Sequence, residues 1–336
     1  MAKIIGVDLG TANTLIYMKG KNIVLRAPSV AAIDKESRQI VALGREAKQM
    51  LGKTPDGIIA FRPVKDGVVA DVGICAKMLR AYFEATDSIA LFSRPSVIVC
   101  IPFGVTEVEK NAVETAVYEA GARSVALIYE PLAAALGAGI RIDGTRWRMI
   151  VDIGGGTAEV SVISGGKIII SETLRVAGDA FDESIIKYLR SRAEILIGDA
   201  TAEELKLKVG SAHPSFDRAR NMQVFGRSLR SGLASSAVVT AADVRAAITP
   251  DLEKIAGAIT ETLSRLTPEL ASDVYDFGIM MTGGVSYLPG IGALIHERTG
   301  VKIEFVKRPF ESVCIGIGRI IESESVPEEL LQFRSR

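Results

Sequence analysis

Short apolar runs, separated by glycine-containing turns, occur in the same order at two places in the chain. They span residues 4–7, 15–18 and 23–25 in the first copy, and 149–151, 160–163 and 168–170 in the second. Glycine turns between runs of β-branched residues are typical of β-hairpins. A three-strand unit that occurs twice predicts two related domains, which also suits a chain of 336 residues.

Longer apolar patterns with helical periodicity fill much of the remaining chain. They span residues 105–120, 182–193 and 240–266, and they are typical of amphipathic helices. Because both halves combine strands with helices, the sequence predicts an α/β fold with one mixed sheet in each half.

The longest uncharged segment, residues 277–295, is almost long enough to span a bilayer, which takes about 20 residues. Gly283-Gly284 and Pro289-Gly290 divide this segment into a strand, a loop and the start of a helix. We therefore expect it to be buried core rather than a membrane span.

A polar loop that contains glycine follows the first strand of each copy, at residues 8–14 (DLGTANT) and 152–159 (DIGGGTAE). Glycine lets backbone N–H groups approach phosphate oxygens, and a threonine hydroxyl adds a donor. Asp8 and Asp152 cannot bind phosphate directly, because like charges repel, but they can hold Mg²⁺ or its waters. Two such loops that face each other would clamp a polyphosphate from both sides.

Two other phosphate-binding motifs do not account for these loops. No GxxxxGK[ST] segment occurs in the chain, so a Walker-type loop is excluded. The three glycines at 154–156 precede a strand, whereas the dinucleotide-binding motif joins a strand to a helix.

Two segments rich in small residues can form closely packed helices. One follows the strand end at residues 127–131 (LIYEP), and the other is residues 312–318 (SVCIGIG). If the two helices cross, they form a hinge over a cleft between the domains, although ordinary tight packing explains the second segment equally well. Glu130, at the strand–helix junction, can orient an attacking water or simply interact with the helix dipole.

A third strand-to-glycine loop lies at residues 280–286 (MMTGGVS), where the backbone could contact an adenine ring or a ribose phosphate. Residues 201–206 (TAEELK) predict a helix that starts with a capping box from Thr201 to Glu204. Without further information, the charges of this segment are typical of a solvated helix face.

The composition narrows the possible partners and the compartment. Lys plus Arg and Asp plus Glu both total 40, so no overall field favours nucleic acid or anionic lipid, and we predict no nucleic-acid partner. Three distant cysteines and two histidines show no disulfide or zinc spacing. The first residues run directly into an apolar strand without a signal-peptide pattern, so we expect a cytoplasmic protein.

The segments described so far occur in the order typical of the superfamily of actin and heat-shock chaperone ATPases. Their residues resemble those of the MreB family of bacterial actins. Residues 62–67 (RPVKDG), 107–110 (EVEK) and 175–179 (RVAGD) also resemble this family, and the resemblance extends over essentially the whole chain. It implies an actin-like ATPase fold, in which two related RNase H-like domains, each a mixed sheet with helices, flank a nucleotide cleft. Domain I would span residues 1–145 with a subdomain inserted at about 33–76, and domain II residues 146–336 with an insertion at about 184–261.

The resemblance also implies a function. Members of the family are ATPases that polymerise into membrane-associated filaments and organise cell-wall synthesis, which sets a rod-like cell shape. The expected cofactors are ATP and Mg²⁺. The expected partners are further copies of the chain in a double protofilament, the inner face of the cytoplasmic membrane and the cell-wall elongation machinery. Hydrolysis would be slow until a filament contact completes the geometry.

Individual residues receive roles from the same resemblance. Asp8 and Asp152 would hold hydrated Mg²⁺, and Glu130 and Thr157 would order the hydrolytic water. The nucleotide contacts would come from the glycine loops and the 201–206 helix, namely Gly10, Thr11, Ala12, Asn13, Gly154, Gly155, Gly156, Thr157, Glu203, Glu204, Leu205, Lys206, Gly283, Gly284, Val285 and Ser286.

Members of the family attach to membranes through an N-terminal amphipathic helix or an apolar loop. We see no such helix at the start of this sequence, but Leu91 and Phe92, followed by Arg94, stand where the apolar loop is expected. An apolar pair beside a basic residue fits insertion into a membrane interface. Burial of the pair in the protein core explains the pattern equally well.

Four positions depart from the usual pattern of the family. Val285 replaces a third glycine, Ala158 a hydroxyl residue and Tyr129 an acidic residue, while Phe103 is unusual beside Pro102. If position 285 requires a positive φ, valine would be strained there, and Ala158 removes one possible donor.

Because of these departures, a divergent nucleotide-binding scaffold with weak hydrolysis remains an alternative function. A small-molecule kinase of the same superfamily is a second alternative, although the sequence offers no candidate base for an acceptor. A peptide-binding chaperone is not expected, because little sequence follows Ile320-Ile321.

Overall fold

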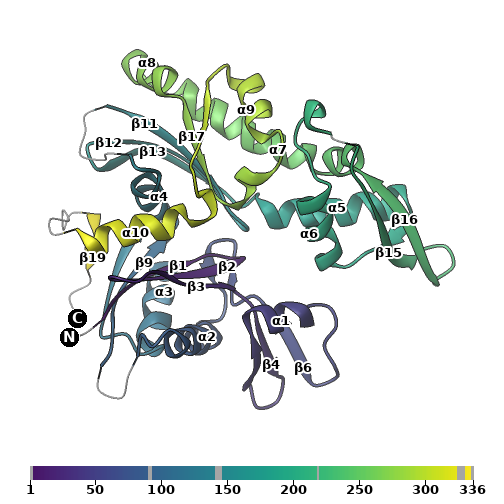
Figure 1. The fold of residues 1–336 in the computed structure, drawn as a ribbon, viewed down its shortest axis with the longest axis horizontal. Helices are drawn as coiled ribbons and strands as arrows, with labels where there is room; N and C mark the ends of the chain where they lie inside the picture. Colours follow the sequence, from purple (N-terminus) through teal and green to yellow (C-terminus); the bar gives the residue numbers. More distant parts are fainter. Residues whose placement is uncertain (1–2, 90–92, 141–145, 218, 324–329, 334–336) are drawn as a thin grey trace.

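The computed structural model describes residues 3–89, 93–140, 146–217, 219–323 and 330–333. Two large sheets, one from each half of the chain, lie on either side of a pair of helices (Figure 1). The first sheet has the strand order β19-β10-β9-β1-β2-β3. Its strands are β1 (Ile4–Leu9), β2 (Asn13–Met18), β3 (Asn22–Pro28), β9 (Ser96–Ile101), β10 (Ser124–Tyr129) and β19 (Gln332–Phe333).

The second sheet repeats the arrangement of the first, in the order β13-β12-β11-β17-β18. Its strands are β11 (Arg148–Ile153), β12 (Ala158–Ser164), β13 (Lys167–Leu174), β17 (Ile279–Thr282) and β18 (Ile303–Phe305). In both sheets three consecutive strands pair antiparallel. A later strand (β9 or β17) pairs parallel with the first of them, and a second later strand (β10 or β18) pairs parallel with that one. The first sheet has in addition β19, which is antiparallel to β10. The predicted three-strand repeat and the mixed sheet in each half are therefore confirmed.

Helices cover the outer faces of both sheets. The first sheet carries α2 (Val72–Ala85) and α3 (Glu107–Glu119), and the second carries α5 (Gly178–Arg192), α7 (Ala241–Ser264), α8 (Pro268–Phe277) and α9 (Ile291–Thr299). The three predicted helices correspond to α3, α5 and α7, and α5 begins four residues before its predicted start at residue 182.

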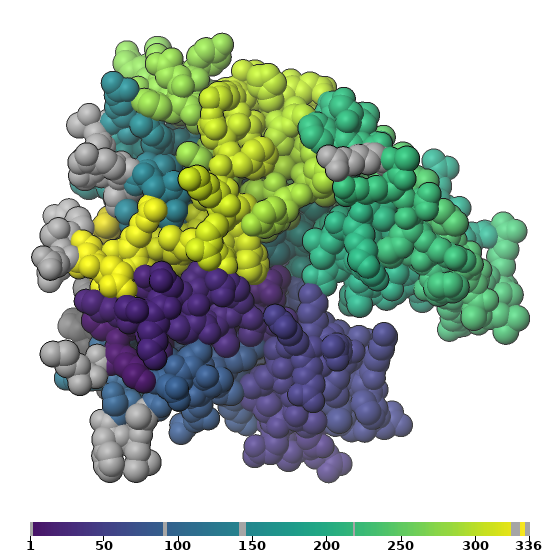
Figure 2. Space-filling model, viewed as in Figure 1, coloured from purple at the N-terminus to yellow at the C-terminus, as the bar shows by residue number. Residues whose placement is uncertain are grey.

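A small subdomain extends from each half on the same side of the molecule (Figure 1). The first contains β4 (Ala31–Asp34), β5 (Ile40–Leu43), α1 (Gly44–Met50) and β6 (Ile58–Phe61), followed by the hairpin of β7 (Val64–Lys65) and β8 (Val68–Val69). The second contains β14 (Ile195–Leu196), α6 (Asp199–Lys208), the short helix η1 (Pro214–Phe216), β15 (Asn221–Ser228) and β16 (Ala234–Thr240). Figure 2 shows the two subdomains facing each other across a recess.

The start of α6 differs from the prediction. The helix begins at Asp199 after the N-cap residue Gly198, and no side chain caps it. Thr201 and Glu204 lie inside the helix, where Glu204 pairs with Lys208 one turn later. The predicted capping box is wrong because the helix gains almost one more turn, with the acidic Asp199 favourably placed near its N-terminus.

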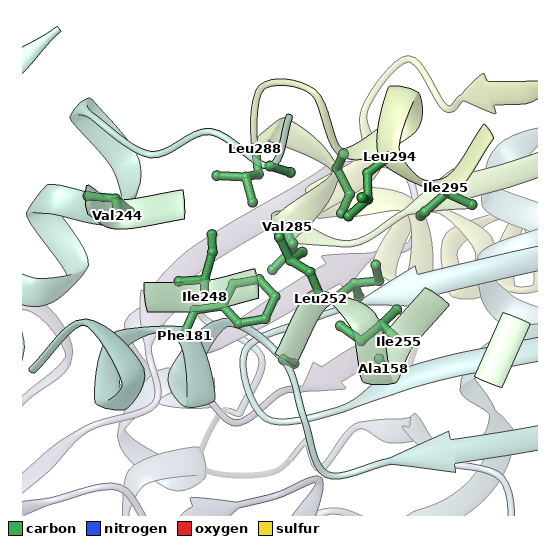
Figure 3. Packing of buried hydrophobic residues seen from close by; sticks show 14 of the residues in the cluster. Ala158, Phe181, Val244, Ile248, Leu252, Ile255, Val285, Leu288, Leu294 and Ile295 are labelled. Carbon is green, nitrogen blue, oxygen red and sulfur yellow. The ribbon is translucent and has the colours of Figure 1, made fainter. Parts of the chain in front are cut away.

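The helix α7 holds the second half together through apolar side chains at helical spacing. Val244, Ile248, Leu252 and Ile255 are all buried in one cluster with the fully buried Phe181 of α5, which lies next to Ile248 (Figure 3). Such spacing places one apolar stripe against the core. The same cluster includes residues of the segment between β17 and α9, so this segment is packed against the core.

The uncharged segment 277–295 forms β17, the short helix η2 (Gly284–Tyr287) and the beginning of α9. This confirms the predicted division into strand, loop and helix. Within the described ranges, no helix combines the length and apolar character needed to cross a membrane.

Two helices, α4 (Glu130–Ala138) and α10 (Ser312–Glu322), cross between the large sheets (Figure 1). A third short helix, η3 (Pro309–Glu311), leads into α10. A Cβ atom on Gly137 would overlap the backbone of Ser312, and one on Gly316 would overlap the carbonyl of Ala133. The hydroxyl of Ser312 donates to the Ala134 carbonyl at 3.0 Å. Glycine is therefore required on both sides for the close crossing.

We predict that Gly316→Ala destabilises the protein by about 1–3 kcal/mol, because the added methyl group forces the two backbones apart. A matched control is Gly257→Ala in α7, where nothing lies within 4 Å of the new Cβ and alanine favours the helix by roughly 1 kcal/mol. Urea unfolding of both variants measures the difference. Equal unfolding midpoints would contradict the role of this crossing.

Candidate functional site

The recess between the two halves leads into a cavity of about 420 Å³. It lies at the carboxyl ends of β1 and β11, and the loops that follow these strands form its floor. Residues of α1, α5, α6, η2 and η3 form its walls. Most of the residues predicted to contact a nucleotide, a metal ion or the attacking water line this cavity: Asp8, Gly10, Thr11, Ala12, Asn13, Glu130, Asp152, Gly154, Gly155, Gly156, Thr157, Glu203, Lys206, Gly283, Gly284 and Val285.

Three residues of the prediction do not line the cavity. Leu205 is fully buried in the core, and Glu204 extends away to pair with Lys208. Ser286 is buried, and its hydroxyl donates to the Thr282 carbonyl at 2.7 Å. The helical period explains the first two, because only one side of α6 can face the cavity.

The two glycine loops face each other in close contact, as predicted. A Cβ on Gly155 would lie 2.7 Å from that of Ala12, and one on Gly156 would lie 2.5 Å from the Thr11 hydroxyl. That hydroxyl also accepts a hydrogen bond from the Gly67 N–H group at 3.0 Å. Larger residues would separate the loops, so the glycines are needed for their approach as well as for exposing N–H groups.

Four acidic residues converge at the end of the cavity nearest the sheets. Asp8 is on β1, Asp152 on β11, Glu159 on β12, and Glu130 is the first residue of α4. Asp152 and Glu159 are register partners on neighbouring strands. The β-hairpin thus brings together two carboxyl groups that are seven residues apart.

Burial is the main influence on the acidity of this cluster. It raises the pKa of Asp8 to about 6, that of Glu159 to about 7 and that of Asp152 to about 8. The pKa of Glu130 is raised well above its usual range by burial and then by the charges of Glu159 and Asp8. Removing carboxylates from water disfavours their charged form, and a nearby cation would reverse this effect.

The chemistry of this cluster fits a hydrated divalent cation. Within the described residues, no three His, Cys, Asp or Glu side chains are close enough together to ligate a metal ion directly. Asp8 and Asp152, on opposing strands, can instead accept hydrogen bonds from the water shell of Mg²⁺, which keeps several of its waters in proteins.

Residues that sequence reasoning did not single out also line the cavity. Glu159 closes the second glycine loop, and no local pattern distinguishes it from the other residues of that loop. Lys48, on α1, forms an ion pair with Glu203 of α6 at 2.8 Å, and Arg62 pairs with Asp179 of α5. These two pairs join the halves of the molecule at the mouth of the cavity.

Lys206 is held within the protein. Its Nζ atom donates to the Gly178 carbonyl and to Asp182, both at 2.8 Å. The side chain therefore lines the cavity wall at the N-terminus of α5 while it pairs with one oxygen of the buried Asp182.

Of the four expected departures from the family pattern, Ala158 lies behind the cavity and Val285 lies in its wall. Ala158 is fully buried in the core, so a hydroxyl group there would face apolar side chains (Figure 3). Val285 belongs to the same cluster, and among the described residues it is not one of those with a positive φ. The strain considered for valine at this position therefore does not arise.

The other two departures contact each other. The rings of Phe103 and Tyr129 meet edge to face, with their centroids 5.0 Å apart. The Lys110 Nζ atom lies 3.3 Å from the Tyr129 hydroxyl. Such a ring pair contributes about 0.5–1.5 kcal/mol beyond its buried area. The predicted membrane residues Leu91 and Phe92 lie outside the described residues.

The pKa of Glu159 predicts a pH-dependent stability for the metal-free and nucleotide-free protein. Because folding raises this pKa from 4.5 to about 7, the native state binds more protons than the unfolded state between these values. The contribution of Glu159 to stability is therefore fully present below about pH 4.5 and falls as the pH rises towards 7.

Thermal melts in EDTA should show this fall as a decrease of several degrees between pH 5 and pH 7.5. Glu159→Gln, which removes the titrating group, should make the decrease smaller. A variant with the same slope as the unchanged protein would contradict the assignment.

Known proteins of one family resemble this chain over most of its length. The family model described as MreB/Mbl protein matches residues 2–329. The chain is 43% identical to the cell shape-determining protein MreB of Escherichia coli K12 over 324 residues, which cover 95% of this chain and 93% of that protein. It is 40% identical to the cell shape-determining protein Mbl of Bacillus subtilis over 331 residues, covering 98% and 99%.

Solved structures show the same fold. The crystal structure of MreB5 of Spiroplasma citri bound to AMPPNP has a TM-score of 0.90 at 34% identity, covering 94% of this chain and 95% of that chain. The MamK double helical filament has a TM-score of 0.81 at 21% identity, covering 97% and 100%. The fold is therefore actin-like, and the chain belongs to the MreB/Mbl family of cell shape-determining proteins.

Proposed function

We propose that this chain binds and hydrolyses ATP and polymerises into membrane-associated filaments that organise cell-wall synthesis and set a rod-like cell shape. The observation that carries the proposal is the pair of facing glycine loops above a cluster of buried carboxyl groups. Structures of MreB5 of Spiroplasma citri bound to AMPPNP and to ADP support the proposal that this chain binds an adenine nucleotide.

The phosphates are bound between the loops at 10–13 and 154–157, whose N–H groups and threonine hydroxyls are donors. Asp8 and Asp152 hold hydrated Mg²⁺, which supplies positive charge that neutralises the phosphates. Glu130 and Thr157, at the end of the same cavity, order the water that attacks the terminal phosphate. Catalysis in this arrangement depends on positioning and charge neutralisation.

The nucleoside lies between the second half's loop at 283–285 and the wall formed by α6. Val285, Leu288 and Phe310 give this part of the cavity apolar surface. Glu203 and Lys206 line it with polar groups that contact the ribose or the base. Such a mixture is typical of nucleotide pockets.

The partners proposed are further copies of the chain in a double protofilament, the inner face of the cytoplasmic membrane and the cell-wall elongation machinery. Leu91 and Phe92 are the proposed membrane contact. The location is thus cytoplasmic and peripheral to the membrane.

A nucleotide-binding scaffold with weak hydrolysis is the second candidate function, since Tyr129 and Phe103 change the surroundings of Glu130.

Sedimentation of the purified protein with ATP and Mg²⁺, with and without anionic liposomes, tests the proposal, with pellets viewed by electron microscopy and phosphate release measured in parallel. We expect filaments that require nucleotide, and phosphate release without an added acceptor. Glu130→Gln should slow release by about 100-fold or more while ATP still binds. A protein that binds ATP but neither assembles nor releases phosphate would favour the scaffold.

The ion pair between Lys48 and Glu203 predicts a further effect on the nucleotide. Because it closes the mouth of the cavity, Lys48→Ala should accelerate nucleotide release. Both side chains are partly exposed, at 36% and 27%, so the change should be at most about fivefold, corresponding to roughly 1 kcal/mol.

Stopped-flow displacement of a fluorescent ATP analogue measures this release rate. The exchange of the pair, Lys48→Glu with Glu203→Lys, should restore slow release, and Lys53→Ala, at an exposed position just after the end of α1, is a matched control. If single and exchanged variants release nucleotide equally fast, the pair does not close the cavity.

A further inference from the structure

The outer edge of the first sheet holds a short segment from the C-terminal end of the chain. The strand β19 pairs antiparallel with β10, so that Gln332 lies opposite Leu127. We propose that this edge of β10 is a peptide-binding site, which residues 330–332 occupy in the free chain and which an extended segment of a partner protein with the same residue pattern takes in their place. The site is separate from the nucleotide cavity and does not depend on the function proposed above.

The strand β10 has more edge than the resident segment uses. On its inner side it pairs with β9 at every position from Ser124 to Tyr129. On its outer side, within the described part of the chain, only Ala126 and Leu127 have a strand partner. An exposed strand edge is a template for pairing with another extended chain. A longer strand would therefore form more backbone hydrogen bonds here than β19 does.

Two leucines supply the apolar part of the contact. Leu330 is 9% exposed and belongs to the buried cluster that contains Ile128 and Leu132. Leu331 is partly buried against the same cluster. Peptides that add a strand to a sheet edge gain affinity from the main-chain pairing and selectivity from side chains held in such apolar sites. A ligand for this edge must therefore carry leucine or a similar apolar residue at the position of Leu330.

A basic group lies beside the next position of the segment. The Nζ atom of Lys110, on α3, is 3.4 Å from Oε1 of Gln332 and 3.3 Å from the hydroxyl of Tyr129. The same Nζ atom pairs with Glu107 at 3.0 Å, and the Lys110 side chain is 14% exposed. An amide oxygen or a carboxylate at the position of Gln332 can accept from this group. The expected ligand is thus an extended peptide with two leucines followed by glutamine or glutamate.

The resident segment is held lightly enough to be exchanged. Its strand pairing with β10 covers two residues, and α3 contributes one side-chain contact. A segment that is covalently attached near its site has an effective concentration of the order of 1 mM there. Because the segment is docked, its intrinsic Kd must lie below about this value. A separate peptide then competes poorly with it unless the resident segment is weakened.

Isothermal titration of a peptide of residues 328–336 (EELLQFRSR) into the full chain, without nucleotide, tests the proposal. Leu330→Asp in the full chain removes the apolar anchor of the resident segment and opens the site. The peptide should bind this variant with a Kd below about 1 mM, and it should bind the unchanged chain at least about twofold more weakly. The same peptide carrying Leu330→Asp is the control and should bind neither protein.

A second variant guards against a loss of folding, which circular dichroism would reveal. Gln332→Pro removes a backbone N–H group from the edge strand and leaves Leu330 in place for the folding of the buried cluster. If either open variant is folded and still fails to bind the peptide well above about 1 mM, the proposal is overturned. Equal affinity for the open variants and the unchanged chain would also overturn it, because the peptide would then bind elsewhere.

The position of the bound peptide can be mapped directly. A peptide with a benzophenone side chain in place of Gln332 should cross-link to α3 or β10 in the open variants when it is irradiated. Cross-links confined to β3, at the opposite edge of the same sheet, would overturn the assignment of the site.

The polar position has its own measurement. A peptide with Gln332→Glu should bind the open variants up to about fivefold more tightly, because its carboxylate pairs with Lys110 near the surface. Lys110→Ala in the open variant should abolish this gain. Lys187→Ala is the matched control, since Lys187 also pairs with a glutamate of its own helix but lies on α5. A gain that survives Lys110→Ala would contradict the proposed orientation of the peptide.

These outcomes are distinguishable from a failure of the proposed function, since every titration is made without nucleotide. A chain that neither hydrolyses ATP nor assembles can still bind the peptide. A chain that forms filaments with ATP but whose open variants bind no peptide would overturn this inference alone.

Discussion

The close contact between the two glycine loops is the constraint on which the rest of the molecule depends. Gly155 and Gly156 admit Ala12 and Thr11 at distances that leave no room for a side chain. The contact joins the first turn of one three-strand unit to the first turn of the other. Both sheets must therefore present their strand ends to the same space, and the crossing of α4 and α10, with glycine at the contact, allows them to approach. A polyphosphate in the cavity beside this contact would find donors on both loops.

This geometry has an electrostatic cost. Asp8, Glu130, Asp152 and Glu159 are brought into one buried region, where desolvation and mutual repulsion raise their pKa values. A protein selected for stability alone would not place four acids together, and strained electrostatics of this kind are typical of functional sites. A bound cation offsets the repulsion, so occupancy of the site and stability of the closed molecule are thermodynamically linked.

Much of the fold could be predicted from the sequence because its signals are local. The repeated strand–loop–strand pattern, the Pro131 helix start and the division of segment 277–295 each depend on a few neighbouring residues. The ion pairs of Lys48 with Glu203 and of Arg62 with Asp179 join residues more than a hundred positions apart, and no local pattern reports them. Glu204 and Leu205 were predicted to contact the nucleotide but do not line the cavity. The reason is related, since the start of a helix determines which of its residues face the cavity. The hydrogen bonds from the Phe103 N–H group and the Thr173 hydroxyl to Glu159 likewise join residues that only the folded chain brings together.

The four positions that were expected to depart from the family pattern lie in the cavity wall or in the packing beside it. Ala158 packs into the core behind the loops, Val285 belongs to the same cluster and also lines the cavity, and Phe103 and Tyr129 pack against each other next to Glu130. Asp8, Glu130 and Asp152, together with the glycines of the two facing loops, all line the cavity. The contact between Phe103 and Tyr129 connects the segments on either side of Glu130, so these two aromatic residues act on the packing around the carboxyl group and not on the groups that line the cavity. The groups that would bind phosphate, Mg²⁺ and the attacking water are therefore all present, and the expected departures fall on the wall beside the nucleoside and on the packing that supports Glu130.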